Sequence, residues 1–235
     1  MGFVVDYDLF KRRCELKFFL GTTNPGKVRD FAAILAASGI ELEVCDPVDP
    51  DETEPDFLGN AALKAKVYSA HSGGISISDD SGLEVDALGG LPGVFSARYS
   101  DCTFNELTKQ LIQHNPSGLS RDEIDKRNNR LVLDQLKGVP RESRTARFVV
   151  ALVVSDQEGN ILFSETGKSE GFIVEEPRGQ NGFGYDEIFE GIDTFGKTYA
   201  EIDPMRKNLR SHRKQVLVKF KDWVRDFASG RESLH

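Results

Sequence analysis

The chain has 235 residues, of which 39% are apolar and 29% are charged, and its formal net charge is −8. This composition is typical of a globular protein with one large domain or two small lobes. The acidic balance argues against a general nucleic-acid binder and a basic membrane-surface protein, and no apolar stretch is long enough to span a bilayer.

Acidic residues interrupt the first segment, which therefore lacks the composition of a signal or transit peptide. We interpret residues 1–15 as an extension, residues 16–229 as a single α/β domain with two lobes, and residues 230–235 as a frayed tail. The three cysteines, Cys14, Cys45 and Cys102, form no C-x-x-C pair. They favour reduced thiols over a disulfide framework or a zinc site, so we expect a cytoplasmic protein.

Residues 17–20 form a short apolar run that predicts the first strand. A polar loop follows, and apolar residues then recur at helical spacing: Val28, Phe31, Ile34 and Leu35. Asn24 is a good N-cap, and Pro25 fits the first position of the helix. A loop, a helix N-terminus and the cation of Lys27 together indicate an anion site. A well-capped helix with a solvated lysine explains this stretch about equally well.

The same stretch imitates the phosphate loop of the P-loop NTPases. Gly21, Gly26 and Lys27 have the required spacing. The next position of that motif is Ser or Thr, which holds Mg²⁺, and here it is Val28. A P-loop NTPase that releases orthophosphate is therefore a second candidate.

Residues 41–45 predict a second strand, and residues 46–56 then contain six acids. Such a run is usually a solvated loop, although it can supply a carboxylate to a metal. Residues 57–71 predict a helix that Asp56 caps, with an apolar face formed by Leu58, Ala61, Ala62, Ala65 and Tyr68.

A short apolar strand over residues 75–78 leads into Asp79, Asp80, Ser81 and Gly82. We expect these four residues to form a tight turn at the end of the strand, where an open α/β sheet places its ligand site. Hard carboxylate oxygens there suit Mg²⁺. By themselves, the four residues favour an ordinary polar turn, because turns of acids and glycine are common.

The second half of the chain predicts alternating helices and strands. The expected segments are a helix over 104–113, a helix over 121–137 with a capping box of Ser120 and Glu123, a buried central strand over 148–154, its hairpin partner over 161–163, a further strand over 171–174, and a last helix within 202–227 whose apolar stripe starts at Leu209.

Two segments of this half can recognise a nucleotide. Residues 177–190 interleave aromatic side chains with glycines, and rings beside small residues can form a flat slot for a base. A surface loop anchored by its aromatic residues is the plainer alternative. A basic cluster precedes the last apolar stripe: Lys207, Arg210, His212, Arg213 and Lys214. It can bind phosphate or a purine, or form a solvated basic face.

Taken together, four segments closely resemble the inosine triphosphate pyrophosphatase family: residues 22–27, 79–100, 182–189 and 211–213. Enzymes of this family hydrolyse non-standard purine nucleoside triphosphates, such as ITP, dITP and XTP, to the monophosphate and pyrophosphate. The resemblance implies an α/β fold with a long, mixed, twisted sheet, helices on both faces, and two lobes around a central active-site cleft. It also implies a homodimer.

The resemblance also implies a role for each matching residue. The triphosphate would be contacted by Thr22, Thr23, Asn24, Pro25, Gly26 and Lys27. Asp80 matches the acid that acts as general base and helps bind Mg²⁺, and Ser81 lies beside it at the substrate. The base and sugar would be held by Phe183, Gly184, Tyr185 and Asp186, together with Lys207, His212 and Arg213. Asp79 receives no role.

The chain departs from the family pattern in the acidic loop and the helix after it. Residues 51–54 read Asp-Glu-Thr-Glu, where many members have Glu-Glu-Thr-Gly, so the second metal ligand is either Asp51 or Glu52. Gly59 stands where the family usually carries Glu. If that Glu assists the metal, one carboxylate is missing or is replaced by a neighbour.

A triphosphate is highly negative, so an acidic protein needs Mg²⁺ and local cations to hold it. Lys27, Lys207 and Arg213 supply such cations. We therefore expect an Mg²⁺-dependent nucleoside triphosphate diphosphatase that binds a purine nucleotide and neither nucleic acid nor a membrane. A third candidate is a nucleotide-binding regulatory module without turnover, which the departure at Gly59 makes plausible.

Overall fold

The computed structural model describes residues 17–36, 38–48 and 50–229. The predicted extension over 1–15 and the predicted tail over 230–235 lie outside these residues. The strands are β1 (Lys17–Leu20), β2 (Glu41–Val44), β3 (Ser76–Val85), β4 (Cys102–Phe104), β5 (Leu111–His114), β6 (Thr145–Ser155), β7 (Ile161–Ile173) and β8 (Phe189–Gly191). The α-helices are α2 (Pro25–Leu35), α3 (Phe57–Ser72), α4 (Arg121–Gln135), α5 (Pro204–Arg210) and α6 (His212–Ala228).

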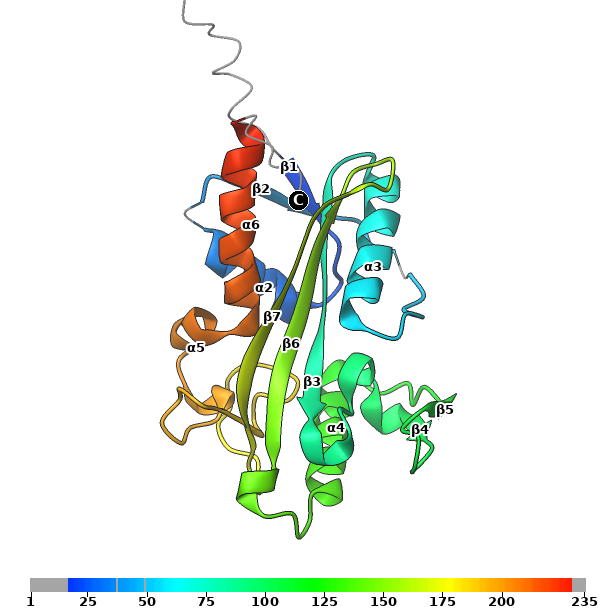
Figure 1. Ribbon diagram of the computed structural model, residues 1–235, viewed down its shortest axis with the longest axis vertical. Helices are drawn as coiled ribbons and strands as arrows, with labels where there is room; N and C mark the ends of the chain where they lie inside the picture. The colour runs from blue at the N-terminus through cyan, green and yellow to red at the C-terminus, as the bar shows by residue number, and fades with distance from the viewer. Residues whose placement is uncertain (1–16, 37, 49, 230–235) are drawn as a thin grey trace, which may run out of the picture.

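The main sheet is mixed and has the strand order β2-β1-β3-β6-β7-β8. β1 is parallel to both of its neighbours, whereas β3, β6, β7 and β8 pair antiparallel in sequence. Figure 1 shows the long strands β3, β6 and β7 running together through the length of the molecule, with α6 (red) and α3 (cyan) on either side. The α/β class and the mixed sheet predicted from the sequence are confirmed.

Alternation along β6 explains why both faces of the sheet are covered. Successive side chains of a strand point to opposite faces. One set packs with α2 and α6: Val150, Leu152 and Val154. The other set packs with α3: Val149, Ala151 and Val153. A separate cluster at the far end of the long strands joins them to α4.

The edge of β3 that faces β1 is open over much of its length. β1 pairs with β3 only at Phe19–Ser76 and Leu20–Ile77. On its other edge, β3 pairs with β6 continuously from Ser76 to Val85. No strand of the described chain therefore covers the first edge beyond Ile77 until the bridge between Glu84 and Pro92.

The predicted turn at Asp79–Gly82 is wrong, because these residues lie in the middle of β3. Each faces a residue of the apolar strand β6; for example, Asp79 pairs with Leu152 and Asp80 with Ala151. The backbone hydrogen bonds of this long-range ladder fix an extended chain. Neighbouring cations, described below, neutralise the acids within it.

The predicted helix over 104–113 is also wrong. The segment forms the hairpin of β4 and β5, and a turn at Asn105 separates the two strands. The side-chain oxygen of Asn105 accepts the N–H groups of Leu107 and Thr108 at 3.0 and 2.9 Å. Lys109 then has a φ of 58°, which a helix does not allow. Local side-chain capping of this kind competes with helix formation.

Two further boundaries differ from the prediction. Residues 171–173 belong to β7 and form no separate strand. The last helix is divided at Ser211, whose side chain accepts the N–H of Lys214 at 3.1 Å and caps α6. Leu209 falls on α5 and is 64% exposed, so it is not part of the buried stripe. The predicted caps at Asn24 and Asp56 and the capping box at Ser120 are confirmed.

None of the helices in the described ranges has the length and apolar composition needed to cross a membrane. Cys45 is buried, Cys102 is half-buried, and both are free thiols. The cytoplasmic location stays a prediction.

Gly82 is required where β3 passes the loop that follows it. A Cβ atom at this position would lie 2.6 Å from the carbonyl oxygen of Gly93 and would collide with the side chain of Ser96. We expect Gly82→Ala to lower the free energy of unfolding by about 1–3 kcal/mol through overpacking, measured by urea denaturation. Ser164→Ala, at an exposed position of β7, is the control and should change it by less than about 0.5 kcal/mol. Equal stability of the two variants would contradict the close approach.

Candidate active site

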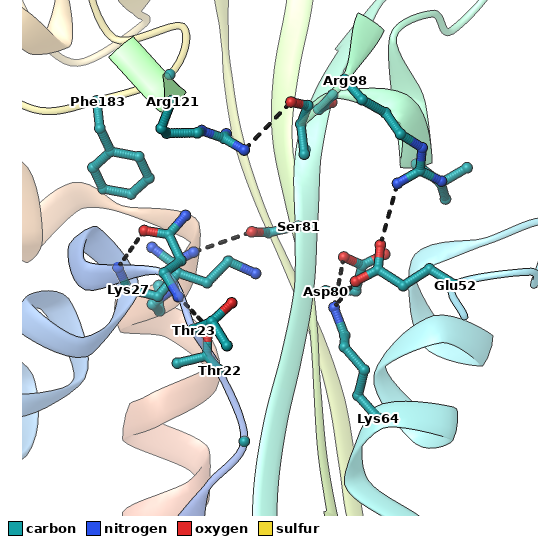
Figure 2. A pocket seen from close by; sticks show the side chains of 18 of the residues that line it. Thr22, Thr23, Lys27, Glu52, Lys64, Asp80, Ser81, Arg98, Arg121 and Phe183 are labelled. Carbon is teal, nitrogen blue, oxygen red and sulfur yellow. Dashed lines mark hydrogen bonds and ion pairs between the residues drawn. The ribbon is translucent and has the colours of Figure 1, made fainter. Parts of the chain in front are cut away.

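A cleft of about 490 Å³ lies along the open edge of β3. Its lining comes from the loop after β1, the acidic loop before α3, the middle of β3, the segment around Arg98, the aromatic segment around Phe183, and the start of α6. Figure 2 shows Thr22, Thr23 and Lys27 on one side of β3 and Glu52, Asp80 and Lys64 on the other. The cleft thus brings together segments from all parts of the described chain.

Asp79 and Asp80 point to opposite faces of the sheet, because they are neighbours in a strand. Asp79 faces α2 and α6, where its carboxylate lies 3.1 Å from Lys27 Nζ and 3.1 Å from Arg213 Nη2. Asp80 faces α3, where its carboxylate lies 3.0 Å from Lys64 Nζ. The two acids therefore belong to separate ion clusters on the two sides of one strand.

The ion cluster around Asp79 is buried and serves to hold the fold together. The side chain of Asp79 is fully buried, and Arg213 also donates to Asp30 Oδ2 at 2.7 Å and to Ser81 Oγ at 3.1 Å. Burial alone would raise the pKa of Asp79, but the charges of Lys27 and Arg213 lower it well below its ordinary value. Asp79 is thus ionised and neutralises two cations, a role that sequence reasoning did not assign.

The cluster of Asp80 joins two carboxylates through one lysine. Lys64 Nζ lies 2.8 Å from Glu52 Oε1 as well as 3.0 Å from Asp80 Oδ1. Burial raises the pKa of Asp80, although Lys64 opposes the effect. Burial also acts to raise the pKa of Glu52, but the nearby charge of Lys64 lowers it. Asp51 lies exposed at the rim of the cleft.

The donor set on this side fits Mg²⁺. Two hard carboxylates, Asp80 and Glu52, converge on one point that already attracts a cation. Among the described residues, no group of three or more His, Cys, Asp or Glu side chains could hold a metal. A pair of carboxylates such as Asp80 and Glu52 suits Mg²⁺, which usually takes one or two carboxylates from the protein and completes its shell with water and substrate phosphates.

Asn60 connects the acidic loop to Asp80. Its side chain accepts the N–H of Glu54 at 3.0 Å and donates to the Glu54 carbonyl and to Asp80 Oδ2, both at 3.3 Å. The side chain of Glu54 also lies against Gly59, where a Cβ atom would be only 2.7 Å from Glu54 Cβ. Glu54 therefore fills the space that a side chain at position 59 would need.

In the loop after β1, only some of the polar groups are free to contact a ligand in the cleft. Asn24 Oδ1 accepts the N–H groups of Gly26 and Lys27 at 2.8 and 3.3 Å, so the cap itself uses them. Thr22, Thr23, Asn24 and Lys27 line the cleft, whereas Pro25 and Gly26 lie outside its lining. A Cβ atom at Gly26 would be 2.7 Å from the ring of Phe183. Gly26 thus provides the space in which that ring rests.

The aromatic segment is held in place by Asp186 and Lys207. Asp186 Oδ2 accepts the N–H of Phe183 at 2.9 Å and forms a buried ion pair with Lys207. The ammonium of Lys207 lies 4.9 Å from the centroid of the Phe183 ring, a cation–π distance. Tyr185 is buried, and its hydroxyl donates to the carbonyl of Ser96 at 2.9 Å. Residues 183–186 all line the cleft, and these contacts fix their backbone.

α4 holds the Gly184 peptide from both sides. Asp125 Oδ2 accepts the N–H of Gly184 at 2.9 Å, and Asn129 Nδ2 donates to its carbonyl at 3.0 Å. Asp125 and Asn129 are four residues apart and so lie on one face of the helix. The sequence did not lead us to include either residue in the site. The available signal was the pair of polar side chains on one face of the predicted helix, a face that is buried in the structure.

His212 begins α6 and lies buried beside the cleft. Its ring stacks on Phe148 with a centroid distance of 5.2 Å and an interplanar angle of 13°. Burial lowers the pKa of His212 well below its ordinary value, and the charges of Arg213 and Lys207 lower it further. The imidazole is therefore neutral, with one donor and one acceptor nitrogen, and Nδ1 has no hydrogen-bond partner among the described residues.

Three further site residues were missed by sequence reasoning: Asn60, Lys64 and Arg98. Arg98 Nη1 lies 3.6 Å from Glu52 Oε2. Asn60 and Lys64 stand four apart on α3 beside the buried residues Ala61 and Ala65. A lysine within the apolar face of a predicted helix was the available signal, since lysines are almost never fully buried without a partner.

Comparison with known proteins shows which family the chain belongs to. A family model described as the Ham1 family matches residues 18–223. The chain belongs to the Ham1 family. It is 41% identical over 216 residues to a dITP/XTP pyrophosphatase of Geobacillus kaustophilus, covering 90% of this chain and 96% of the relative. It is also 41% identical to a dITP/XTP pyrophosphatase of Bacillus subtilis, covering 85% and 92% of the two chains.

Solved structures support the membership. A HAM1 protein from Coxiella burnetii superimposes with a TM-score of 0.73 and 29% identity, covering 90% of this chain and all of that one. A nucleoside-triphosphatase, dITP/XTP pyrophosphatase, from Mycobacterium abscessus gives a TM-score of 0.63 at 35% identity, with 87% and 98% covered. The resemblance inferred from the four sequence segments is thus confirmed at the level of family and fold.

The buried cluster around Asp79 can be tested through stability. In Asp79→Asn, Lys27 and Arg213 would lose a buried counter-charge, so we expect the free energy of unfolding to fall by about 3–5 kcal/mol. Asp222→Asn is the matched control, because its carboxylate pairs with Arg225 at 3.2 Å while 58% exposed. Urea denaturation of both variants measures the difference. A loss at Asp79 no larger than that at Asp222 would show that the cluster contributes little to folding.

Proposed function

We propose that this protein hydrolyses non-standard purine nucleoside triphosphates, such as ITP, dITP and XTP, to the monophosphate and pyrophosphate with Mg²⁺. The observation that carries the proposal is the convergence of Asp80 and Glu52 on one cationic point, with Lys27 and the loop after β1 on the opposite side of the same strand. The names of the two Ham1 relatives, dITP/XTP pyrophosphatases, agree with it.

The triphosphate would lie along the open edge of β3. Thr22, Thr23 and Asn24 offer polar groups there, and Lys27 adds a cation. Asp80 and Glu52 would hold Mg²⁺, which supplies charge neutralisation for the phosphates and polarises the attacked phosphorus centre. Of the two alternatives for the second ligand, the structure favours Glu52, because Asp51 is exposed and Glu52 shares a partner with Asp80.

Asp80 would act as the general base. Its carboxylate accepts a proton from a water molecule as the oxygen of that water attacks the α-phosphorus. The bond from the α-phosphorus to the bridging oxygen breaks, and pyrophosphate leaves. A carboxylate placed within reach of the attacking water can accept its proton. Asn60 donates to Oδ2 of the carboxylate and so holds it in one orientation.

The other end of the cleft would select the base. The ring of Phe183 offers a stacking surface, Lys207 lies next to it, and neutral His212 lines the same cleft. A donor from either side chain would bind the 6-oxo group of hypoxanthine or xanthine. The 6-amino group of adenine would leave that donor unpaired, and such mismatches can reduce kcat/KM by several powers of ten. Arg213 is engaged by Asp79, Asp30 and Ser81, so its main contribution is to fix the floor of the cleft.

A nucleotide panel tests the reaction. With Mg²⁺, we expect pyrophosphate from ITP, dITP and XTP and much less from ATP. Asp80→Asn should lower kcat by about 10²–10⁴-fold, because the general base is lost. The exposed variant Asp222→Asn should keep the activity of the wild type. Release of orthophosphate would support the P-loop alternative, and binding of ITP without any IMP formation would support the regulatory module.

We also propose a homodimer, as the family resemblance implies, with the β4–β5 hairpin in its interface. This hairpin pairs with no other strand of the described chain, and an isolated two-stranded ribbon is marginal in water. It exposes Leu107 by 93% and Ile112 by 65%. Apolar side chains gathered on an exposed element often mark an association surface.

Light scattering after size exclusion tests the dimer. The wild-type protein should have twice the 26.1 kDa mass of one chain. Combining Leu107→Asp with Ile112→Asp should give the mass of one chain, because two charges would be buried in the interface. Ile192→Asp, at a residue 67% exposed on another part of the surface, should leave the dimer intact. A monomeric wild type would exclude the proposal.

A further inference from the structure

The ammonium of Lys64 occupies the point on which the two candidate metal ligands converge. Its Nζ atom lies 3.0 Å from Asp80 Oδ1 and 2.8 Å from Glu52 Oε1. The side chain starts on α3 and is only 10% exposed, so it is not a solvated surface lysine. Figure 2 shows it reaching up from α3 to both carboxylates.

The carboxylates of Glu52 and Asp80 can lie close together because a cation lies between them. Glu52 belongs to the acidic loop before α3, whereas Asp80 belongs to β3, and no hydrogen bond joins the two side chains directly. Two negative charges in a partly buried cleft repel each other unless a positive charge lies between them. In the structure, Lys64 supplies that charge.

Each carboxylate also has a contact that does not involve Lys64. Asn60 Nδ2 donates to Asp80 Oδ2 at 3.3 Å, and Arg98 Nη1 lies 3.6 Å from Glu52 Oε2. These contacts use the oxygen of each carboxylate that Lys64 leaves free. The carboxylates would therefore keep their places if the ammonium withdrew and another cation took the same position.

We propose that Lys64 is a built-in competitor of the divalent cation: it bridges Asp80 and Glu52 in the nucleotide-free protein and must withdraw before a metal binds there. The inference rests on the proposed function, in which the same carboxylates hold Mg²⁺. An ammonium and a divalent ion that contact the same oxygens would repel each other strongly at such short range. Both therefore cannot occupy this point.

The competition makes metal binding depend on the nucleotide. Free Mg²⁺ would have to displace a lysine that loses both of its charged partners, so its binding is weak. A nucleotide bound together with Mg²⁺ brings phosphates that can accept the displaced ammonium. By linkage, nucleotide and metal then raise each other's affinity.

Metal titration of the nucleotide-free protein tests the inference. Mn²⁺ serves as the probe, because its binding is read by electron paramagnetic resonance without turnover. We expect Lys64→Met to bind Mn²⁺ about tenfold more tightly than the wild type, which corresponds to about 1.4 kcal/mol. Lys66→Met is the control, since Lys66 is an exposed neighbour on the same helix and should leave the affinity unchanged.

The outcomes separate this inference from the proposed function. Equal or weaker Mn²⁺ binding by Lys64→Met overturns the inference and leaves the metal site standing. Absence of binding in all three proteins overturns the metal site and the inference together. A second measurement needs no folded variant: the ¹⁵N signal of the Lys64 ammonium in the wild type should shift as Mg²⁺ is added without nucleotide. A signal that stays unchanged at saturating Mg²⁺ also overturns the proposal.

Discussion

The site exists because β1 ends before β3 does. β1 makes its last pair at Leu20–Ile77, whereas β3 runs on to Val85 along β6. The strand beyond Ile77 is thus held firmly on one edge and open on the other. Side chains from both of its faces can reach around the open edge, so a ligand in the cleft meets residues that a complete sheet would keep apart. The loop after β1 enters the cleft for the same reason, since it starts where the pairing stops.

Two adjacent acids on this strand point to opposite faces of the sheet and have different partners there. Asp79 is fully buried and pairs with Lys27 and Arg213, and Asp80 turns to a cluster that opens into the cleft. A buried ion pair adds little net stability but is costly to break, because one charge is then left without a partner. The first cluster therefore fixes the strand and the start of α6, while the second leaves its carboxylate available for chemistry. Only the alternation of the strand separates the two roles.

Sequence reasoning succeeded where the signal was local. The caps at Asn24 and Asp56 and the central strand β6 follow from short patterns, and all four family segments contribute residues to the lining of the cleft. It failed where distant contacts decide the structure. The turn predicted at Asp79–Gly82 is extended because β6 pairs with it across about seventy residues. The hydrogen bond from the Gly184 N–H to Asp125 spans 59 positions, so a polar residue on a predicted helix does not reveal which segment it will contact.

The aromatic segment around Phe183 and the helix that follows the loop after β1 are in direct contact. The ring of Phe183 rests in the space left by Gly26, so the proposed stacking surface touches the start of α2, the helix that follows the loop after β1. From there, α4 holds the backbone of Gly184, and Lys207 holds Asp186. The position of Phe183 relative to the loop after β1 is thus set by packed atoms on both sides. A nucleotide would be recognised by its base and its phosphates together, because neither end of the cleft can shift without the other.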